Sequence, residues 1–246
     1  MGKKFKGKTC VYCAKNLSDT GDHVFAREFF LPRVRGILPK VPACNDCNSE
    51  KSGYEHYLAS LLPFGARYGD ARITLETMVP KRLAKNLKLH RTLSQQQMKI
   101  LSKENRRLYR PTIVLPFHFA QLKKLFEMVV KGLVWYHWQT LLTEEYFVQV
   151  LALTKIGEDF FDHHFFALKT RARVNVSLGN GALSYEGVQG VDYPQITAWR
   201  FSVYGGVKLS ESTDAPDGVS SRIGTLTGPK QLLSDGGENG TEDSLV

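Results

Sequence analysis

The sequence predicts an α+β protein, and three observations support this fold class. All four cysteines lie near the N-terminus, in two Cys-x-x-Cys pairs. An amphipathic helical pattern begins at Phe119, and strand-like runs follow it. A composition that is 42% apolar over 246 residues is sufficient for a packed core and excludes disorder of the whole chain. We predict four parts: a cysteine-stapled unit (1–65), a basic helical arm (66–110), a C-terminal α+β domain (111–209) and an acidic, Gly/Ser-rich, disordered tail (210–246).

The composition also bears on location and partners. No apolar run reaches the roughly 18 residues that a membrane-spanning helix needs. The best run, from Val129 to Trp138, is interrupted by Lys131 and His137. The first residues lack an apolar signal region. We therefore expect a cytoplasmic protein with no membrane contact, whose net charge of +9 indicates a polyanionic partner.

The cysteine spacing indicates a metal site. Cys10 and Cys13 form one pair, Cys44 and Cys47 the other, and 30 residues separate the pairs. A disulfide framework is not expected in a chain of this size in a reducing compartment. A thioredoxin-like redox pair would lie at a strand-to-helix junction of a βαβ unit, and neither pair has that context. Two such pairs typically hold a structural Zn²⁺, whose four thiolates leave no open position for catalysis.

The residues between and beside the cysteine pairs carry a more specific pattern. Asp22-His23 follows the first pair, and the second pair lies within Val-Pro-Ala-Cys-Asn-Asp-Cys-Asn-Ser-Glu-Lys-Ser, residues 41–52. Together these features resemble the HNH endonuclease family over about residues 8 to 60, roughly a fifth of the chain. The resemblance implies a zinc-stapled ββα-metal module. It also implies catalysis by His23, Asp22 and Asn48, with Mg²⁺ or Mn²⁺ held by Asp22 and Asn48.

The residue types suit this chemistry on their own terms. Phosphodiester hydrolysis needs a base for water and a cation for the phosphate, and neutral histidine is available near pH 7. Asp22 and Asn48 offer the hard oxygen ligands that Mg²⁺ prefers. Because adjacent strand residues point to opposite faces, Asp22 and His23 can share a site only if the strand is distorted or ends there. The structural alternatives are a buried His23, a turn-capping Asp22 and an Asn48 that caps a helix.

A helix should follow the second cysteine pair. Its apolar spacing runs from Asn48 to about Leu62, and Pro63 helps to end it. Lys51 and Glu55 lie on the face of Asn48, so we expect Lys51 to contact phosphate. Glu55 is either an outer ligand, an orienting partner of a ligand, or a solvated helix residue. Arg27 is expected to add a further phosphate contact.

One departure from the family pattern concerns its middle asparagine. That residue normally precedes the second cysteine pair and braces the loop that holds the histidine. Between His23 and Cys44 this chain contains no asparagine. The resemblance therefore leaves the bracing of His23 unexplained.

The basic arm concentrates the positive charge. Residues 81–110 contain ten Lys or Arg and one acid, Glu104, a net charge of +9. We expect one helix over the first basic residues and a second, capped by Ser94, that runs to Tyr109. We expect this arm to follow and contact a phosphate backbone. The alternative interpretation is that the arm is a solvated linker between domains. The contact residues are Lys81, Lys85 and Lys88 on one helical face, with Arg106 and Arg107.

The C-terminal part shows no catalytic motif. A helix is expected from Phe119 to near Leu142, packed on an antiparallel sheet. Predicted strands cover 146–153, 165–176 and 196–203, with a hairpin turn at Asn180-Gly181. The acids and histidines of residues 159–164 suggest an aromatic core element with polar residues outward rather than a metal site.

The sequence therefore predicts a metal-dependent DNA endonuclease that nicks one strand by default. Bacterial or phage defence, restriction and mobile elements are the expected settings, and homodimerisation or other protein partners are expected through the C-terminal domain. The alternatives are a non-catalytic, zinc-stabilised DNA-binding protein and an RNA-directed nuclease. The tail, with a net charge of −5, is interpreted as an electrostatic brake on the basic surface.

Overall fold

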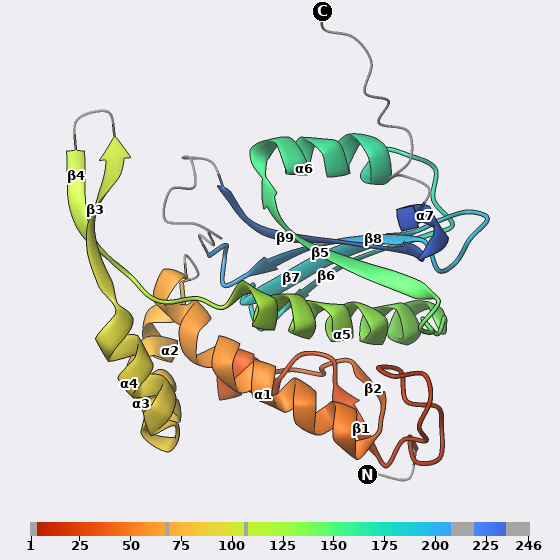
Figure 1. The fold of residues 1–246 in the computed structure, drawn as a ribbon, viewed down its shortest axis with the longest axis horizontal. Coiled ribbons are helices and arrows are strands. Elements are labelled where there is room, and N and C mark those ends of the chain that lie inside the picture. Colours follow the sequence, from red (N-terminus) through yellow and green to blue (C-terminus); the bar gives the residue numbers. More distant parts are fainter. Residues whose placement is uncertain (1–3, 67–68, 106–107, 208–218, 235–246) are drawn as a thin grey trace, which may run out of the picture.

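The computed structural model describes residues 4–66, 69–105, 108–207 and 219–234. It is a mixture of helix and sheet, which confirms the predicted α+β class. Figure 1 shows a layered arrangement in which a five-stranded sheet has α5 on one face and α6 on the other. The first hairpin and α1 lie beyond α5, on the side away from the sheet. None of the described helices is long and apolar enough to cross a membrane.

The N-terminal part is an antiparallel hairpin followed by a helix. Strand β1 (Thr20–His23) pairs with β2 (Lys40–Ala43), and His23 lies opposite Lys40. Helix α1 (Asn45–Leu61) begins three residues earlier than predicted, with Cys44 at its N-cap. Asn48 therefore lies inside the first turn, and the alternative that it caps this helix is wrong. Short 3₁₀ helices cover 27–29, 32–34 and 62–65.

The basic segment differs from its prediction. It contains three short helices, α2 (Ala71–Thr77), α3 (Val79–Lys85) and α4 (Leu87–Gln96). Asn86 separates the last two and caps α4, its side chain accepting a hydrogen bond from the Leu89 N–H. Lys81 and Lys85 thus lie on α3 and Lys88 on α4, so the expected single helical face is wrong.

The expected helix from Ser94 to Tyr109 is also wrong. Helix α4 ends at Gln96, and the chain then forms an antiparallel hairpin of β3 (Met98–Asn105) and β4 (Leu108–Val114). In Figure 1 this hairpin projects away from the rest of the molecule. The prediction rested on local signals alone, a capping box of Ser94 and Gln97 and a stop at Pro111, whereas pairing between two strands is a nonlocal interaction that overrides such local preferences. Arg106 and Arg107 lie outside the described residues.

The main sheet has the strand order β5-β9-β8-β7-β6 and is antiparallel throughout. Strands β5 and β8 lie within a residue of their predicted bounds, whereas the strand predicted from residue 165 begins at Ala172 because 155–166 is helical. The Asn180-Gly181 turn is confirmed, with positive φ angles of 56° and 88°. The elements are α5 (Phe119–Trp138), β5 (Tyr146–Thr154), α6 (Lys155–Phe161), β6 (Ala172–Leu178), β7 (Leu183–Gln189), β8 (Thr197–Val203), β9 (Val219–Pro229) and α7 (Gln231–Ser234).

The predicted disordered tail contains a structural strand. Strand β9 lies between β5 and β8 and pairs with both, and Ile223 and Thr225 are buried. The prediction is therefore wrong for residues 219–229, because their glycines and polar residues masked an alternating strand pattern. All seven acids of the tail lie outside the described residues, as does the charged segment invoked for an electrostatic brake.

A single core joins the N-terminal and C-terminal parts. One cluster of buried residues includes Val24 and Leu58 from the first part and Val129, Leu133 and Phe201 from the second. Helix α5 supplies much of this contact because it passes close to both α1 and β5. The predicted boundaries at 65 and 111 therefore do not separate two independent cores.

Glycine and aromatic contacts explain how closely the two parts approach. A Cβ added at Gly132 on α5 would lie 3.0 Å from Val24, so a larger residue would push α5 away from the chain that follows β1. The rings of Phe25 and Tyr185 lie 5.6 Å apart. The Tyr204 hydroxyl donates a hydrogen bond to the Phe29 carbonyl over 2.9 Å. The sheet thus fixes the loop that continues from His23.

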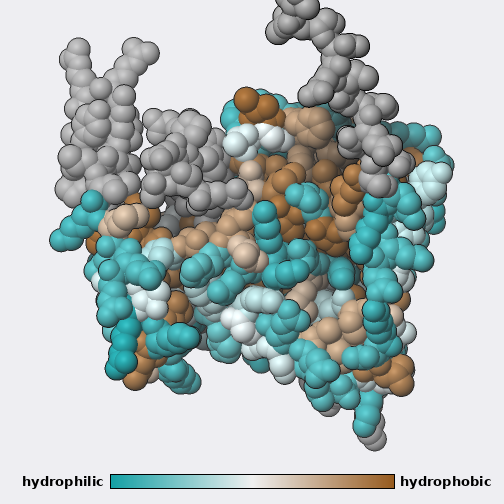
Figure 2. Space-filling model, viewed as in Figure 1, coloured by the Kyte–Doolittle hydropathy of each residue, from teal (hydrophilic) through white to brown (hydrophobic). Residues whose placement is uncertain are grey.

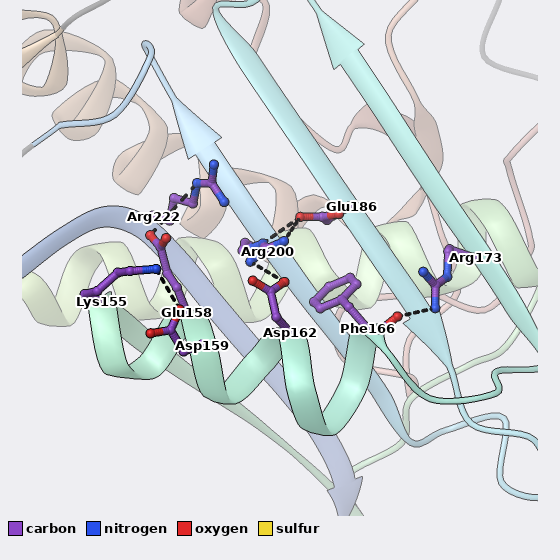
Figure 3. Close-up of polar contacts among 9 residues, drawn as sticks. All are labelled: Lys155, Glu158, Asp159, Asp162, Phe166, Arg173, Glu186, Arg200 and Arg222. Carbon is purple, nitrogen blue, oxygen red and sulfur yellow. Dashed lines mark hydrogen bonds and ion pairs between the residues drawn. The ribbon is translucent and has the colours of Figure 1, made fainter.

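The outer face of the sheet is covered by α6 and carries an ionic network. Phe161 and Phe166 are buried there in a smaller apolar cluster. In Figure 3, Arg200 binds Glu186 and reaches Asp162 at 2.9 Å. In the segment 159–164 the acids and histidines are exposed, as expected, and Phe161 is buried, but Phe160 is exposed, so the expected aromatic core element is only partly correct. Among the described residues only the cysteines group as a metal site. Figure 2 shows a mostly hydrophilic surface around α1 to α4, with hydrophobic residues gathered between α5 and α6.

Candidate functional site

The four cysteines converge on one point. Their Sγ atoms all lie within 4.8 Å of one another. The first pair lies in the loop before β1, where Ala14 adopts a left-handed φ of 55° that turns the chain back. The second pair begins α1, whose first N–H group at Asn45 is capped by the Asp19 carboxylate over 2.9 Å. The loop and the helix start are therefore held together at this point.

The surroundings of the sulfurs are suited to a bound cation. The Asn16 N–H lies 3.5 Å from the Cys13 Sγ, and its side-chain amide lies 3.9 Å from the Cys44 Sγ. Burial disfavours ionisation of Cys13, but backbone N–H groups of Asn16 and Lys15 outweigh it and lower the pKa of this thiol to about 7. Burial raises the pKa of Cys10, so its thiolate requires a compensating cation. The four cysteines can hold a metal ion, and their donor set is compatible with structural zinc.

Directly beside this cluster, an open cleft collects the predicted catalytic residues. The cleft has a volume of about 460 Å³ and is polar. Asp22 and His23 come from the end of β1, Asn48 comes from the first turn of α1, and Arg27 comes from the 3₁₀ helix 27–29 that follows β1. Asp22 and His23 reach the same cleft because β1 ends at His23. The full lining is Asp22, His23, Ala26, Arg27, Glu28, Asn48, Ser49, Ser52 and Glu55.

Asp22 is held by two neighbours. Its Oδ2 accepts a hydrogen bond of 2.7 Å from the Tyr12 hydroxyl and lies 3.0 Å from the Lys51 Nζ. Burial, followed by the charge of Asp22, raises the pKa of Tyr12 well above its ordinary value, so Tyr12 remains a donor. Sequence reasoning did not identify Tyr12. The only available signal was its position between the first two cysteines.

His23 is half-buried, and its surroundings favour the neutral imidazole. Burial lowers the pKa of its imidazole, the positive charges of Lys40, Arg27 and Lys51 lower it further, and Asp22 opposes them. The Nδ1 atom is buried and has no hydrogen-bond partner among the described residues. A neutral imidazole that lines an open cleft can accept a proton from a bound water molecule.

Lys51 corrects one sequence prediction. We expected a phosphate contact, but its side chain is fully buried. The Nζ atom donates a hydrogen bond of 2.7 Å to the His23 carbonyl and pairs with Asp22 and Glu55. Burial raises the pKa of Glu55 to about 7, although Lys51 opposes this shift. Lys51 is therefore not one of the residues that line the cleft. It contacts the candidate catalytic residues from the protein interior and does not face a ligand.

The expected nucleic-acid contacts divide into exposed and structural residues. Arg27 is exposed at the cleft, and Lys81, Lys85 and Lys88 are exposed on their helices. Arg82, which sequence reasoning treated only as part of the charge, donates hydrogen bonds to the carbonyls of Ala59 and Glu28. This arginine therefore fixes α3 against α1 and against one wall of the cleft.

Comparisons with known proteins give no assignment. No family model, curated protein or solved structure matches this chain. The chemistry of the cleft therefore follows from its own residues. It offers a neutral imidazole, carboxylate and amide oxygens suited to a hard cation, and an exposed guanidinium group that can bind an anion.

Proposed function

We propose that this protein is a metal-dependent HNH endonuclease that hydrolyses phosphodiester bonds in DNA. The observation that carries the proposal is that Asp22, His23 and Asn48 line one open cleft next to the four-cysteine cluster. Three residues chosen for their chemistry thus meet, although 24 residues separate His23 from the next of them along the chain. The combination of a hard-cation site, a neutral base and a separate sulfur site is what the resemblance to this family implies.

In the proposed reaction, His23 accepts a proton from the water molecule that attacks phosphorus. The bond from phosphorus to the 3′ oxygen of the leaving strand breaks, and that oxygen takes a proton from solvent. Arg27 holds a non-bridging oxygen of the phosphate. Asp22 and Asn48 would hold a Mg²⁺ or Mn²⁺ ion, whose positive charge would offset the negative charge that develops on the phosphate and on the leaving oxygen.

The four-cysteine zinc has a structural part in this proposal. It joins the loop that leads into β1, the strand of Asp22 and His23, to the start of α1, which carries Asn48. With four thiolate ligands the ion has no open position for water. Its contribution is to keep the cleft in shape.

The charge beside the cleft supports a nucleic acid as the substrate, and we propose DNA because the sequence carries no standard RNA-binding signature. The net charge is +9, and exposed Lys81 and Lys85 lie on α3, which Arg82 fixes against the cleft wall. Such a surface binds a phosphate backbone without regard to sequence. One cleft cuts one strand, so a nick is the expected product. Defence, restriction and mobile elements are the proposed settings.

The test is a plasmid-nicking assay with Mg²⁺ or Mn²⁺. We expect wild-type protein to convert supercoiled DNA to the open circle and His23→Ala to lose this activity while it still binds DNA. His163→Ala, which changes an exposed histidine on the π-helical turn after α6, is the matched control and should cut normally. Absence of cutting with either metal, or equal cutting by the His23→Ala variant, would contradict the proposal.

One observation favours a second candidate function, a non-catalytic zinc-stabilised DNA-binding protein. The Asp22 carboxylate already accepts a hydrogen bond from Tyr12 and pairs with Lys51. These two contacts are what a carboxylate with a purely structural role would make. On that reading, DNA binding would survive both Asp22→Asn and His23→Ala, and no metal would support cutting. An assay on single-stranded RNA in parallel separates the RNA-directed alternative from both.

A further inference from the structure

The peptide unit between His23 and Val24 is held from both sides. Its carbonyl oxygen, on His23, accepts the 2.7 Å hydrogen bond from the Lys51 Nζ. Its N–H group, on Val24, donates a hydrogen bond of 2.9 Å to the Pro39 carbonyl. One bond comes from α1 and the other from the chain just before β2. This peptide unit is therefore fixed in orientation immediately after the candidate base.

All donors of Lys51 are used inside the protein. An ammonium group has three N–H donors and no acceptor. Here its three partners are the His23 carbonyl, the Asp22 carboxylate and the Glu55 carboxylate. The side chain is fully buried, so no donor remains for a phosphate or for water. Two of the three partners belong to residues of the proposed catalytic set.

We infer that Lys51 is a positioning residue that braces His23 and Asp22 against α1, the task left open by the missing asparagine. Lys51 lies three residues after Asn48, one turn further along the same helix. A single helix thus carries Asn48 and fixes the backbone of His23 and the carboxylate of Asp22. The inference rests on the proposed function for its catalytic consequence, but the bracing itself is a property of the fold.

The alternative is that Lys51 serves only to stabilise the core. A buried ion pair contributes little net stability compared with apolar residues of similar volume, whereas removal of one partner leaves an uncompensated charge. The single change Lys51→Met would leave Glu55 unpaired and could prevent folding. The double change Lys51→Met/Glu55→Leu removes the pair, leaves Asp22 bonded to Tyr12 and separates folding from positioning.

The experiment compares this double variant with Glu55→Gln and with Lys155→Met. Glu55→Gln keeps an acceptor for Lys51, and Lys155→Met removes an exposed lysine that pairs with Asp159 on α6. For the double variant we expect wild-type zinc content, a cooperative unfolding transition and wild-type DNA affinity in Ca²⁺, with kcat lowered about 100-fold at unchanged KM. Glu55→Gln should keep at least about a tenth of kcat, and Lys155→Met all of it.

A second measurement does not depend on cleavage. If Lys51 holds the peptide unit, amide hydrogen exchange at Val24 should accelerate at least about tenfold in the double variant and remain unchanged in Lys155→Met. Unchanged protection of Val24 would overturn the bracing, whether or not the protein cuts DNA. A double variant that cuts with wild-type kcat would overturn the positioning role and leave the proposed nuclease intact. Loss of the nuclease proposal would instead show as a wild-type protein that does not cut.

Discussion

Lys131 on α5 donates a hydrogen bond of 3.0 Å to the backbone carbonyl of Tyr12, which lies between the first two cysteines. The Tyr12 hydroxyl in turn binds Asp22. Two hydrogen bonds therefore connect the helix that packs on the sheet with the carboxylate of the cleft. Burial lowers the pKa of Lys131, while the nearby charges of Glu127, Cys47 and Cys13 oppose that shift. A positive charge here would also offset the negative charge of a four-thiolate zinc site.

From this contact we expect Lys131→Met to weaken both the fold and the retention of zinc. The variant loses a hydrogen bond from a charged donor, and we expect the free energy of unfolding to fall by about 1.5 to 3 kcal/mol. Zinc release to a competing chelator should also become faster. Lys124→Met is the control, because Lys124 is exposed on the same helix and pairs with Glu127 at its surface. Chemical denaturation and a colorimetric zinc assay measure the two effects, and equal behaviour of both variants would contradict the prediction.

Removal of the metal should loosen the N-terminal part. Cys10 is fully buried, and Cys10→Ser leaves three sulfur ligands. We expect loss of the metal and a loss of stability of about 3 to 5 kcal/mol, or roughly 10 °C in Tm for a chain of this size. Elemental analysis identifies the metal, and thermal melting of wild-type protein with and without a zinc chelator checks the effect. Identical melting of the metal-free and metal-bound wild-type protein would contradict a structural metal.

Two neighbouring basic residues on α3 should behave differently. Arg82 donates to the carbonyls of Ala59 and Glu28, so Arg82→Met should lower the free energy of unfolding by about 1.5 to 3 kcal/mol. Lys81 is exposed, so Lys81→Met should leave stability unchanged. It should instead lower DNA affinity and reduce the slope of log affinity against log salt by about one. Denaturation and salt-dependent binding assays on both variants test this contrast, which fails if Lys81→Met has no effect on binding.

His137 should make stability depend on pH. Burial lowers the pKa of this imidazole, whose Nε2 atom lies 3.0 Å from the Tyr185 hydroxyl. Because the folded-state pKa is below the unfolded value of 6.5, the unfolded chain binds more protons as the pH falls. The contribution is therefore complete above pH 6.5 and is lost as the pH falls below it. His137→Gln should flatten the pH dependence of the free energy of unfolding between about pH 7 and 5, and an unchanged slope would contradict this.

Local patterns in the sequence were reliable where one short segment determines the outcome. The spacing of Cys10, Cys13, Cys44 and Cys47 predicted their convergence, because each pair is a compact unit. Strand β8 was predicted from a strand-like run at 196–203, and the Asn180-Gly181 turn from its left-handed preference.

Interactions between distant segments were not predictable in the same way. The burial of Lys51 depends on β1 lying across α1, and a lysine in a sequence is by default a surface residue. The structural role of Arg82 depends on carbonyls 23 and 54 residues away. Both residues were assigned to nucleic acid or to bulk charge because their partners are not adjacent in the sequence.

The last prediction concerns the segment that composition marked as disordered. Strand β9 lies between β5 and β8, so its removal separates β5 from the rest of the sheet and uncovers the surfaces that the buried Ile223 and Thr225 now cover. A chain that ends at residue 207 should therefore fail to fold. A chain that ends at residue 234 keeps β9 and should melt as the full-length protein does. Circular dichroism and size-exclusion chromatography of both truncations measure this.

Comparison of the chain that ends at residue 234 with the full-length protein also tests the electrostatic brake. The chain that ends at residue 234 lacks four of the seven tail acids, Asp235, Glu238, Glu242 and Asp243. If these acids screen the basic surface, DNA affinity at low salt should rise in this chain and the difference should vanish at high salt. Equal affinity at low salt would rule out a brake formed by these four acids.

A folded, soluble chain ending at residue 207 would contradict the structural role of β9, because no described element could replace a strand that pairs on both of its edges.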